Sequence, residues 1–321
     1  MNKRKLSIVF AGTPEFACPS LKKVLDNEKL VAIITQPDRP AGRGKKLFPP
    51  AVKLMGEKKG IPVYQPKNLE NPAFLKKISS LQPDLLVIVA FGRILPKIVL
   101  DIPRVFSINL HPSLLPKYRG PAPIRWVLIK GEEQTGITIQ RVRETIDTGE
   151  IILQSKVFIN LKDTYGTLSK RLSQQGAEIL IEAIHLIKEN NFKLKPQKGK
   201  ISFAPKITSD TSKINWKTSA QEIHNLVRGL NPSPRAFTTF LKKESPSTIK
   251  IWKTSVWKET LNRKKTFPGT IIKIQKEKGF IVQTEKENLL IEEIQLPGKT
   301  KISAYDFIKG YHIKKGFLLG V

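Results

Sequence analysis

Short apolar runs alternate with amphipathic stretches through the first half of the chain. The runs typical of buried strands are 6–10, 31–35, 84–90 and 105–110. Apolar residues at helical spacing predict helices at 14–25, 51–59, 72–81 and 94–100. Continuous apolar strands separated by helices indicate a parallel sheet covered on both faces, so this half predicts a doubly wound, mostly parallel α/β domain. Ligands of such a domain bind outside the carboxyl ends of its strands.

The pattern changes along the second half of the chain. Two further strands are expected at 137–142 and 151–159, followed by a long helix at 164–190. After a helix at 219–230, short strands are expected at 236–241, 249–256, 269–274, 279–284 and 288–296. Closely spaced short strands favour a small C-terminal β-barrel, with an oligonucleotide-binding-like fold as one candidate.

These patterns divide the chain into three parts. Residues 191–213 lose periodicity and carry proline, glycine and many polar residues, which is typical of a linker. We therefore expect a Rossmann-like domain at 1–190, a linker at 191–213 and a β-barrel domain at 214–321.

Composition narrows the classes of function. Cys18 is the one cysteine of the 321 residues, which excludes a disulfide framework or a cysteine-rich zinc site and favours a cytoplasmic protein. No apolar run approaches the length of a membrane span, so no membrane partner is expected. The net charge of +29 favours an anionic partner, chiefly nucleic acid, although a lysine-rich surface without a specific partner remains an alternative.

Two glycine-containing segments are candidates for phosphate binding. The turn after the first strand, AGTPEF at 11–16, keeps only the first glycine of a dinucleotide-binding turn, so NAD is not expected. The segment 42–46 lacks the spacing of a P-loop. The loop 36–46 is nevertheless rich in turn formers and basic, so it either grips a phosphate backbone or is a solvated surface loop. Its four basic residues are Arg39, Arg43, Lys45 and Lys46.

Candidate catalytic groups gather at the end of the strand that begins near residue 105. Asn109 and His111 are two residues apart, so both side chains project from one face. An imidazole can shuttle a proton and an amide can donate to a developing oxyanion. Asp147 lies in a later turn, and a carboxylate beside a histidine would fix its tautomer. The alternative for His111 is a structural histidine, and no histidine pair has metal-ligand spacing, so no metal is expected.

Around these residues the sequence resembles the folate-dependent formyltransferases. The shared features are Asn109 and His111, the Ser-Leu-Leu-Pro run 113–116, and Asp147 with Gly149. More narrowly, the chain is similar to the methionyl-tRNA formyltransferase branch of that family. The segments that carry this narrower likeness are FAGTPEFA, QPDRPAGRGKK, LHPSLLPKYRGPAPI, Ile-Asn-Trp at 214–216 and Pro-Gly-Thr at 268–270.

The resemblance implies an activity and its residues. The formyl donor would be 10-formyltetrahydrofolate, and the acceptor would be the α-amine of methionine on initiator methionyl-tRNA, in a cytoplasmic, monomeric enzyme. Asn109, His111 and Asp147 would be catalytic, with direct attack by the amine, oxyanion stabilisation by Asn109 and His111, and proton transfer assisted by Asp147. The resemblance places the folate site at Ser113, Leu114, Leu115, Pro116, Phe91 and Gly92. It assigns tRNA binding to Arg39, Arg43, Lys45 and Lys46 of the basic loop and to the barrel domain.

Two departures and two rival functions accompany this resemblance. The segment 140–146 differs from the family's usual Met-rich stretch, and Phe91 stands where a tyrosine is common. A related enzyme that formylates a sugar-nucleotide amine or glycinamide ribonucleotide is one rival, although a basic barrel domain is not needed for so small a substrate. A noncatalytic RNA-binding protein is the other rival, and the intact trio Asn109, His111 and Asp147 argues against it.

Overall fold

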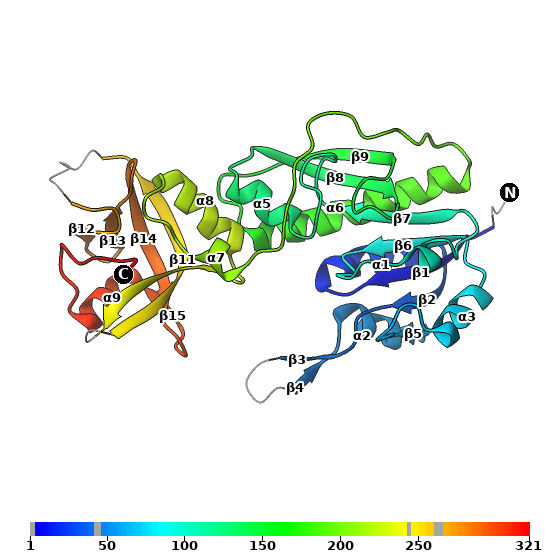
Figure 1. Ribbon diagram of the computed structural model, residues 1–321, viewed down its shortest axis with the longest axis horizontal. Coiled ribbons are helices and arrows are strands. Elements are labelled where there is room, and N and C mark those ends of the chain that lie inside the picture. Colours follow the sequence, from blue (N-terminus) through cyan, green and yellow to red (C-terminus); the bar gives the residue numbers. More distant parts are fainter. Residues whose placement is uncertain (1–3, 42–45, 243–244, 260–265) are drawn as a thin grey trace. The chain divides into compact units, whose positions relative to one another are not determined.

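The computed structural model describes residues 4–41, 46–242, 245–259 and 266–321, and the chain forms two compact units (Figure 1). Unit 1 consists of Met1–Pro123, Gln134–Phe158 and Ser169–Pro205. Unit 2 consists of Ile124–Glu133, Ile159–Leu168 and Lys206–Val321. Among the described residues, no helix combines the length and apolar character that crossing a bilayer requires.

Unit 1 is built on a seven-stranded sheet in the order β5-β2-β1-β6-β7-β8-β9. Strands β1, β2, β5, β6 and β7 run parallel, whereas β8 and β9 pair antiparallel at one side. This confirms the mostly parallel α/β domain that the apolar runs predict. The strands span β1 Ser7–Gly12, β2 Lys29–Ile34, β5 Val63–Tyr64, β6 Leu85–Val89, β7 Phe106–His111, β8 Gln134–Arg141 and β9 Ile151–Phe158.

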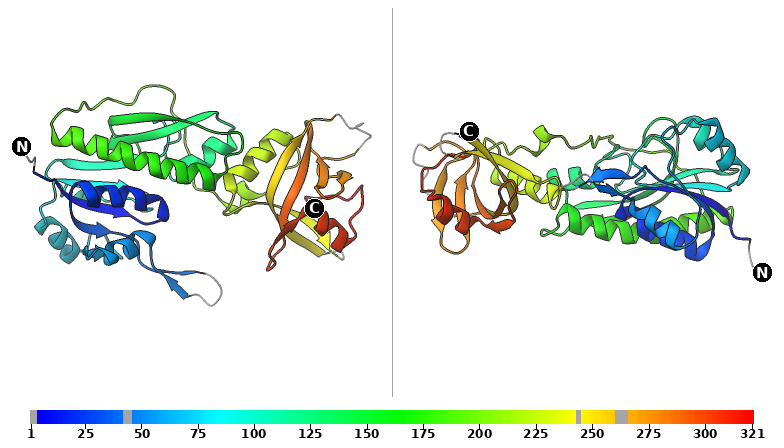
Figure 2. Two further views of the ribbon diagram at one scale, coloured as in Figure 1. Left: turned by 180° about the vertical axis from the view of Figure 1, so that it is seen from behind. Right: turned by 90° about the horizontal axis from the view of Figure 1, so that it is seen from below.

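Helices cover both faces of this sheet. Helix α1 (Cys18–Asn27), entered through the 3-10 turn η1 (Glu15–Ala17), lies beside the long helix α6 (Tyr165–Lys188) on one face (Figure 2). The hydroxyl of Ser173 on α6 donates to the Phe16 carbonyl at 2.7 Å, which ties the two elements together. On the other face, α3 (Pro72–Ser80) and α4 (Lys97–Leu100) pack into an apolar cluster with β1, β2 and β6. Helix α2 (Ala51–Lys58) follows the hairpin of β3 (Arg39–Ala41) and β4 (Lys46–Phe48).

One helix is shorter than its apolar spacing predicts. The expected helix at 94–100 begins only at Lys97, because Pro96 takes the extended N-cap position with ψ of 154°. A proline also disfavours helical conformation in the residue before it. Leu95 is therefore nonhelical, although it is buried in the cluster beneath α4.

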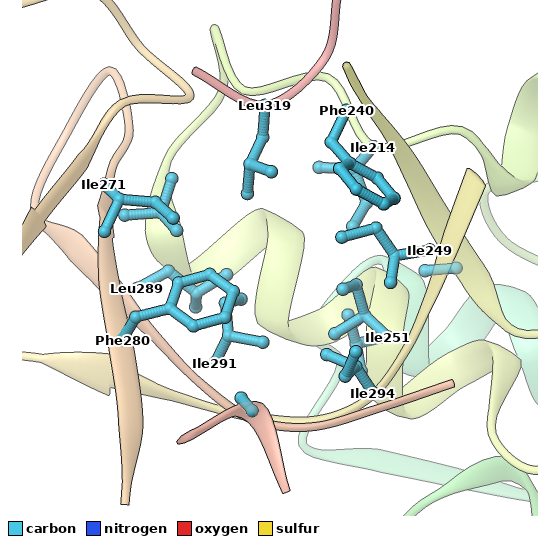
Figure 3. Packing of buried hydrophobic residues seen from close by; sticks show 14 of the residues in the cluster. Ile214, Phe240, Ile249, Ile251, Ile271, Phe280, Leu289, Ile291, Ile294 and Leu319 are labelled. Atoms are coloured by element: carbon cyan, nitrogen blue, oxygen red, sulfur yellow. The ribbon is translucent and has the colours of Figure 1, made fainter. Parts of the chain in front are cut away.

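Unit 2 contains the antiparallel sheet domain that the C-terminal pattern predicts. Its strands are β10 Ala236–Lys242, β11 Ser245–Trp257, β12 Ile271–Gln275, β13 Gly279–Gln283, β14 Asn288–Gln295 and β15 Lys301–Ser303. They pair in the order β10-β11-β14-β13-β12, with β15 on β14. The C-terminal residues bridge the two ends of this order, because Leu319 bridges to Phe240 and Leu318 bridges to Thr270. The sheet therefore closes around an apolar interior (Figure 3).

Helix α8 (Ala220–Leu230) covers this sheet and begins with a capping box. The Ser219 side chain accepts from the Glu222 backbone N–H, and the Glu222 carboxylate accepts from the Ser219 N–H. Short helices α5 (Pro123–Ile129), α7 (Ser209–Ser212) and α9 (Ala304–Tyr311) complete the described helices.

The stretch 191–205 belongs to unit 1. It has no helix and only isolated strand bridges, but it is held at two points, one on strand β9 and one in the loop after β7. Lys195 and Ile151 exchange two backbone hydrogen bonds of 2.7 and 2.9 Å. Farther on, Phe203 bridges to Arg119. This part of the segment that the sequence pattern marks as a linker therefore runs beside the end of β7.

Candidate active site

The carboxyl ends of the parallel strands meet at one edge of the unit 1 sheet. Thr13 follows β1, Gln36 follows β2 and Phe91 follows β6, so three loops converge there. The Phe91 carbonyl accepts hydrogen bonds from the Thr13 hydroxyl at 2.8 Å and from the Gln36 amide at 2.7 Å. Gly92 has a φ of +79°, which strains any residue with a side chain, and a Cβ there would lie 2.5 Å from the Gln36 amide nitrogen and displace that side chain. Phe91 itself is buried in the core.

His111 ends strand β7 at this edge and is only 4% exposed. Its Nε2 lies 2.9 Å from the Tyr118 carbonyl, so in the neutral ring the proton sits on Nε2 and Nδ1 is the free acceptor. Nδ1 faces Asp147 Oδ1 at 3.5 Å, which is longer than a normal hydrogen bond. The imidazole and the carboxylate therefore face each other without a direct hydrogen bond in this structure.

Asp147 is oriented by two hydrogen bonds. Its Oδ2 accepts from the Gly120 backbone N–H at 2.8 Å, and its Oδ1 accepts from the Gln140 amide at 2.9 Å. The residue has a φ of +53°, an uncommon left-handed conformation for a side-chain-bearing residue. At the base of the same loop, Arg143 binds Glu150, and this hydrogen bond holds the pKa of the Glu150 carboxyl below its usual range.

Asn109 lies on β7 two residues before His111 and is partly exposed. Its neighbour across the sheet is Gln140 of β8, and directly opposed residues in an antiparallel pair share a face. Asn109, His111, Gln140 and Asp147 therefore form one polar cluster above the end of β7. The structure brings the three predicted catalytic residues together.

The Ser-Leu-Leu-Pro run forms a tight turn after β7. The Ser113 hydroxyl donates to the Lys117 carbonyl at 2.7 Å, while the Ser113 carbonyl accepts from the Thr138 hydroxyl at 2.6 Å. Thr138 and Gln154, on β8 and β9, also bind the backbone of Leu115. This bonding fixes the turn against the sheet, with Ser113, Leu115 and Pro116 buried and Leu114 partly exposed.

A cavity of about 530 Å³ opens beside the loop that carries Asp147. Volumes of this size are typical of small-molecule sites. Its wall combines apolar and polar side chains from α4, the start of β7 and the end of β8. The lining residues are Lys97, Leu100, Asp101, Pro103, Val105, Phe106, Ser107, Arg141, Val142, Arg143, Glu144 and Thr145.

The basic loop folds as a two-stranded hairpin of β3 (Arg39–Ala41) and β4 (Lys46–Phe48). Arg39 is exposed and donates to Gln36 Oε1. At the base, hydrogen bonds from Gln65 and Lys53 hold the pKa of Asp38 below its usual value, so this carboxylate anchors the hairpin. Arg43 and Lys45 lie outside the described residues, and for Lys46 only the backbone is described.

Several polar residues of this site carry no distinctive sequence signal. Gln140, Thr138, Gln154 and Gln197 each bind the turn after β7 or the Asp147 loop. The alternating pattern of β8 and β9 indicates which positions share a face, so it could have suggested Thr138 and Gln140. Nothing in the pattern indicates Gln197, which lies in the segment without periodicity.

Both halves of the chain match families of known proteins. The family described as formyl transferase matches residues 4–184, and the formyl transferase C-terminal domain matches residues 206–312. A curated relative from Clostridioides difficile, named methionyl-tRNA formyltransferase, is 46% identical over 98% of this chain and 100% of its own length. One of the same name from Thermodesulfovibrio yellowstonii is also 46% identical, over 96% of this chain and 97% of its own.

Solved structures share the fold at low sequence identity. An N-formyltransferase from Helicobacter canadensis, in complex with folinic acid and dTDP-3-aminofucose, superposes with a TM-score of 0.65 at 21% identity, covering 89% of this chain and 98% of its own. HypX from Aquifex aeolicus in complex with tetrahydrofolic acid gives 0.63 at 15% identity, covering 96% of this chain and 47% of its own.

Proposed function

The chain belongs to the formyl transferase family, and we propose that it formylates the α-amine of methionine on initiator methionyl-tRNA, with 10-formyltetrahydrofolate as the donor. The observation that carries this proposal is the cluster of Asn109, His111 and Asp147 at the end of β7. Its support in sequence is the full-length likeness to relatives of that name. The product would supply translation initiation in the cytoplasm.

The residues of the cluster divide the reaction between them. The α-amine attacks the formyl carbon, forming the new C–N bond and a tetrahedral oxyanion. The Asn109 amide stabilises this charge, as does His111 once it is protonated at Nδ1, and one well-placed donor in such a site contributes about 3 to 4 kcal/mol. Collapse breaks the bond to the folate nitrogen, which leaves with a proton.

Asp147 and His111 handle the proton that the amine loses. An unperturbed α-amine has a pKa near 8, so at neutral pH a substantial fraction needs little activation. His111 Nδ1 and Asp147 Oδ1 are both acceptors and lie 3.5 Å apart, so either group can take the proton, directly or through a neighbouring water. Catalysis then depends more on positioning and oxyanion stabilisation than on strong base chemistry. No activated side-chain nucleophile is required.

The folate site is proposed around the turn 113–116 and the Phe91–Gly92 loop, which flank the cluster. The cavity beside the Asp147 loop extends this site, because its apolar wall of Leu100, Phe106 and Val142 fits a flat ring system. The Ser107 hydroxyl at its wall already donates to the Leu100 carbonyl at 2.8 Å. This hydrogen bond joins the start of β7 to the end of α4 at the cavity wall.

The acceptor end of the tRNA is proposed to meet the basic hairpin, through Arg39, Arg43, Lys45 and Lys46, while the barrel of unit 2 binds the tRNA body. The net charge of +29 supports a polyanionic partner. The hairpin also exposes Leu47 and Phe48, which are 66% and 55% exposed. Exposed apolar side chains beside basic ones suit nucleotide bases together with their phosphates.

The test is a formyl-transfer assay on methionylated initiator tRNA with 10-formyltetrahydrofolate, run beside His111→Ala. Formylated methionyl-tRNA from the wild type and a loss of about 100-fold or more in the variant are expected. Near-normal turnover by His111→Ala would refute the assigned chemistry. A dTDP-amino-sugar is the control acceptor. Turnover of this sugar without turnover of the tRNA would show that the chain is a sugar-modifying formyltransferase.

The salt dependence of tRNA binding separates an enzyme from a noncatalytic RNA-binding protein. When the logarithm of the affinity is plotted against the logarithm of the salt concentration, each contact to a duplex phosphate contributes about −0.9 to the slope. A steep slope without turnover of either acceptor would favour a noncatalytic RNA-binding protein.

A further inference from the structure

The stretch 191–205 places one glutamine directly behind the Asp147 turn. Backbone bonds between Lys195 and Ile151 fix the chain on one side of Gln197, and the bridge from Phe203 to Arg119 fixes it on the other. The Gln197 side chain is partly buried between these two points. All of these residues belong to unit 1.

The Gln197 amide uses both of its ends. Its Nε2 donates to the Asp147 carbonyl at 2.9 Å and to the Gly149 carbonyl at 2.8 Å. Its Oε1 accepts from Arg119 Nε at 3.2 Å and Arg119 Nη2 at 2.7 Å. A side-chain amide has two donor hydrogens and two acceptor lone pairs, so these contacts satisfy it completely.

The turn that Gln197 holds is costly to form. Asp147 has a φ of +53°, a left-handed conformation that residues with a side chain adopt uncommonly. Strained residues at functional sites persist only where their surroundings overdetermine them. Gln197 binds the backbone of this turn, whereas Gly120 and Gln140 bind its carboxylate. Gln197 Nε2 also lies 3.4 Å from Gln140 Oε1, so the residues that hold the backbone and the carboxylate of Asp147 are linked to each other.

We propose that Gln197, oriented by Arg119, is a positioning residue that holds the Asp147 turn so that its carboxylate faces His111. The expected change in kcat rests on the proposed function. The expected loosening of the Asp147 turn does not depend on that function. The amide is required, because a glutamate at 197 would keep the acceptor for Arg119 while directing a charged oxygen at two backbone carbonyls. Glutamine and glutamate have almost the same shape, so the comparison of the wild type with Gln197→Glu tests the amide itself.

The kinetic experiment compares Gln197→Ala and Gln197→Glu with the wild type. Misplacing a catalytic group by about 1 Å can cost 100-fold, so both variants should lose 10- to 100-fold in kcat with little change in KM for either substrate. Gln82→Asn is the matched control, since Gln82 also accepts from an arginine, Arg104, but at the opposite edge of the sheet. Wild-type kcat in Gln197→Ala would overturn the proposal.

A double-mutant cycle separates positioning from general stability. In an Asp147→Ala background, Gln197→Ala should lower kcat no further, because its effect passes through the missing carboxylate. A multiplicative loss would overturn the positioning role. Absence of formylation by the wild type would instead refute the proposed function.

Amide hydrogen exchange tests the same inference without activity. The Gly120 N–H is bound by the Asp147 carboxylate, so its exchange should accelerate at least tenfold in Gln197→Ala. The Ser113 N–H, bound to the His111 carbonyl at 2.9 Å, should keep its protection. Unchanged exchange at Gly120 would overturn the proposal whatever the enzyme's substrate.

Discussion

Gly149 offers a sharp perturbation of the Asp147 turn. A Cβ added at this glycine would lie 1.6 Å from the Arg141 carbonyl oxygen, which belongs to the backbone of β8. Real Cβ atoms do not approach closer than 3.0 Å, so in Gly149→Ala the two backbone segments must separate by about 1.4 Å. The turn is the less supported segment, because β8 is paired on both sides.

A displacement of this size has a calculable effect on catalysis. The 3.5 Å gap between Asp147 and His111 would widen, or the carboxylate would lose its bond to Gly120. A misplacement of 1 Å is worth about 100-fold in rate, or about 2.7 kcal/mol in activation free energy. We therefore expect Gly149→Ala to lower kcat for formyl transfer at least 100-fold, measured on purified protein with methionylated initiator tRNA.

Gly60→Ala is the matched control for this substitution. Gly60 has a φ of +68° with nothing within 4 Å of an added Cβ, so alanine there introduces backbone strain without a clash. Such strain lowers stability by about 1 to 2 kcal/mol and leaves kcat unchanged. If Gly149→Ala retained kcat within threefold of the wild type, the argument that the clash with β8 displaces the Asp147 turn would be refuted.

Two further predictions concern stability. The Glu28 side chain is fully buried, and its carboxylate binds Lys188 Nζ at 2.9 Å and the Leu6 N–H at 2.6 Å. Lys188→Ala would remove the only positive charge that these contacts give the carboxylate, so urea denaturation should show a loss of about 3 to 5 kcal/mol, and a loss below 1 kcal/mol would contradict this argument. Burial, and then the nearby Arg228, lower the pKa of His224, so the unfolded chain binds a proton first as pH falls below about 6.5. The stability that the neutral His224 contributes is therefore complete above that pH and declines below it. The melting temperature of His224→Gln should fall less than that of the wild type between pH 7.5 and 5.5, and equal falls would show that another group controls the acid response.

Much of the fold could be predicted from apolar periodicity alone. Strands β6, β7 and β9 lie within two residues of their expected bounds, because each is a buried run with a clear period. The short elements were missed, as with α5 and α9, because one or two helical turns after a proline or a strand carry little periodic signal. The closure of the barrel by Leu318 and Leu319 was equally invisible, since it pairs the chain end with distant strands.

The sequence by itself determined the fold class, the shared face of Asn109 and His111, and the resemblance from which the activity was expected. Those features depend on neighbours along the chain, where a strand's period of two leaves no choice. Tertiary structure alone decided that Asp147 reaches His111 and that Gln197 and Arg119 support its turn. Such contacts join residues far apart in sequence, and packing selects them from many polar side chains that look equivalent in the sequence.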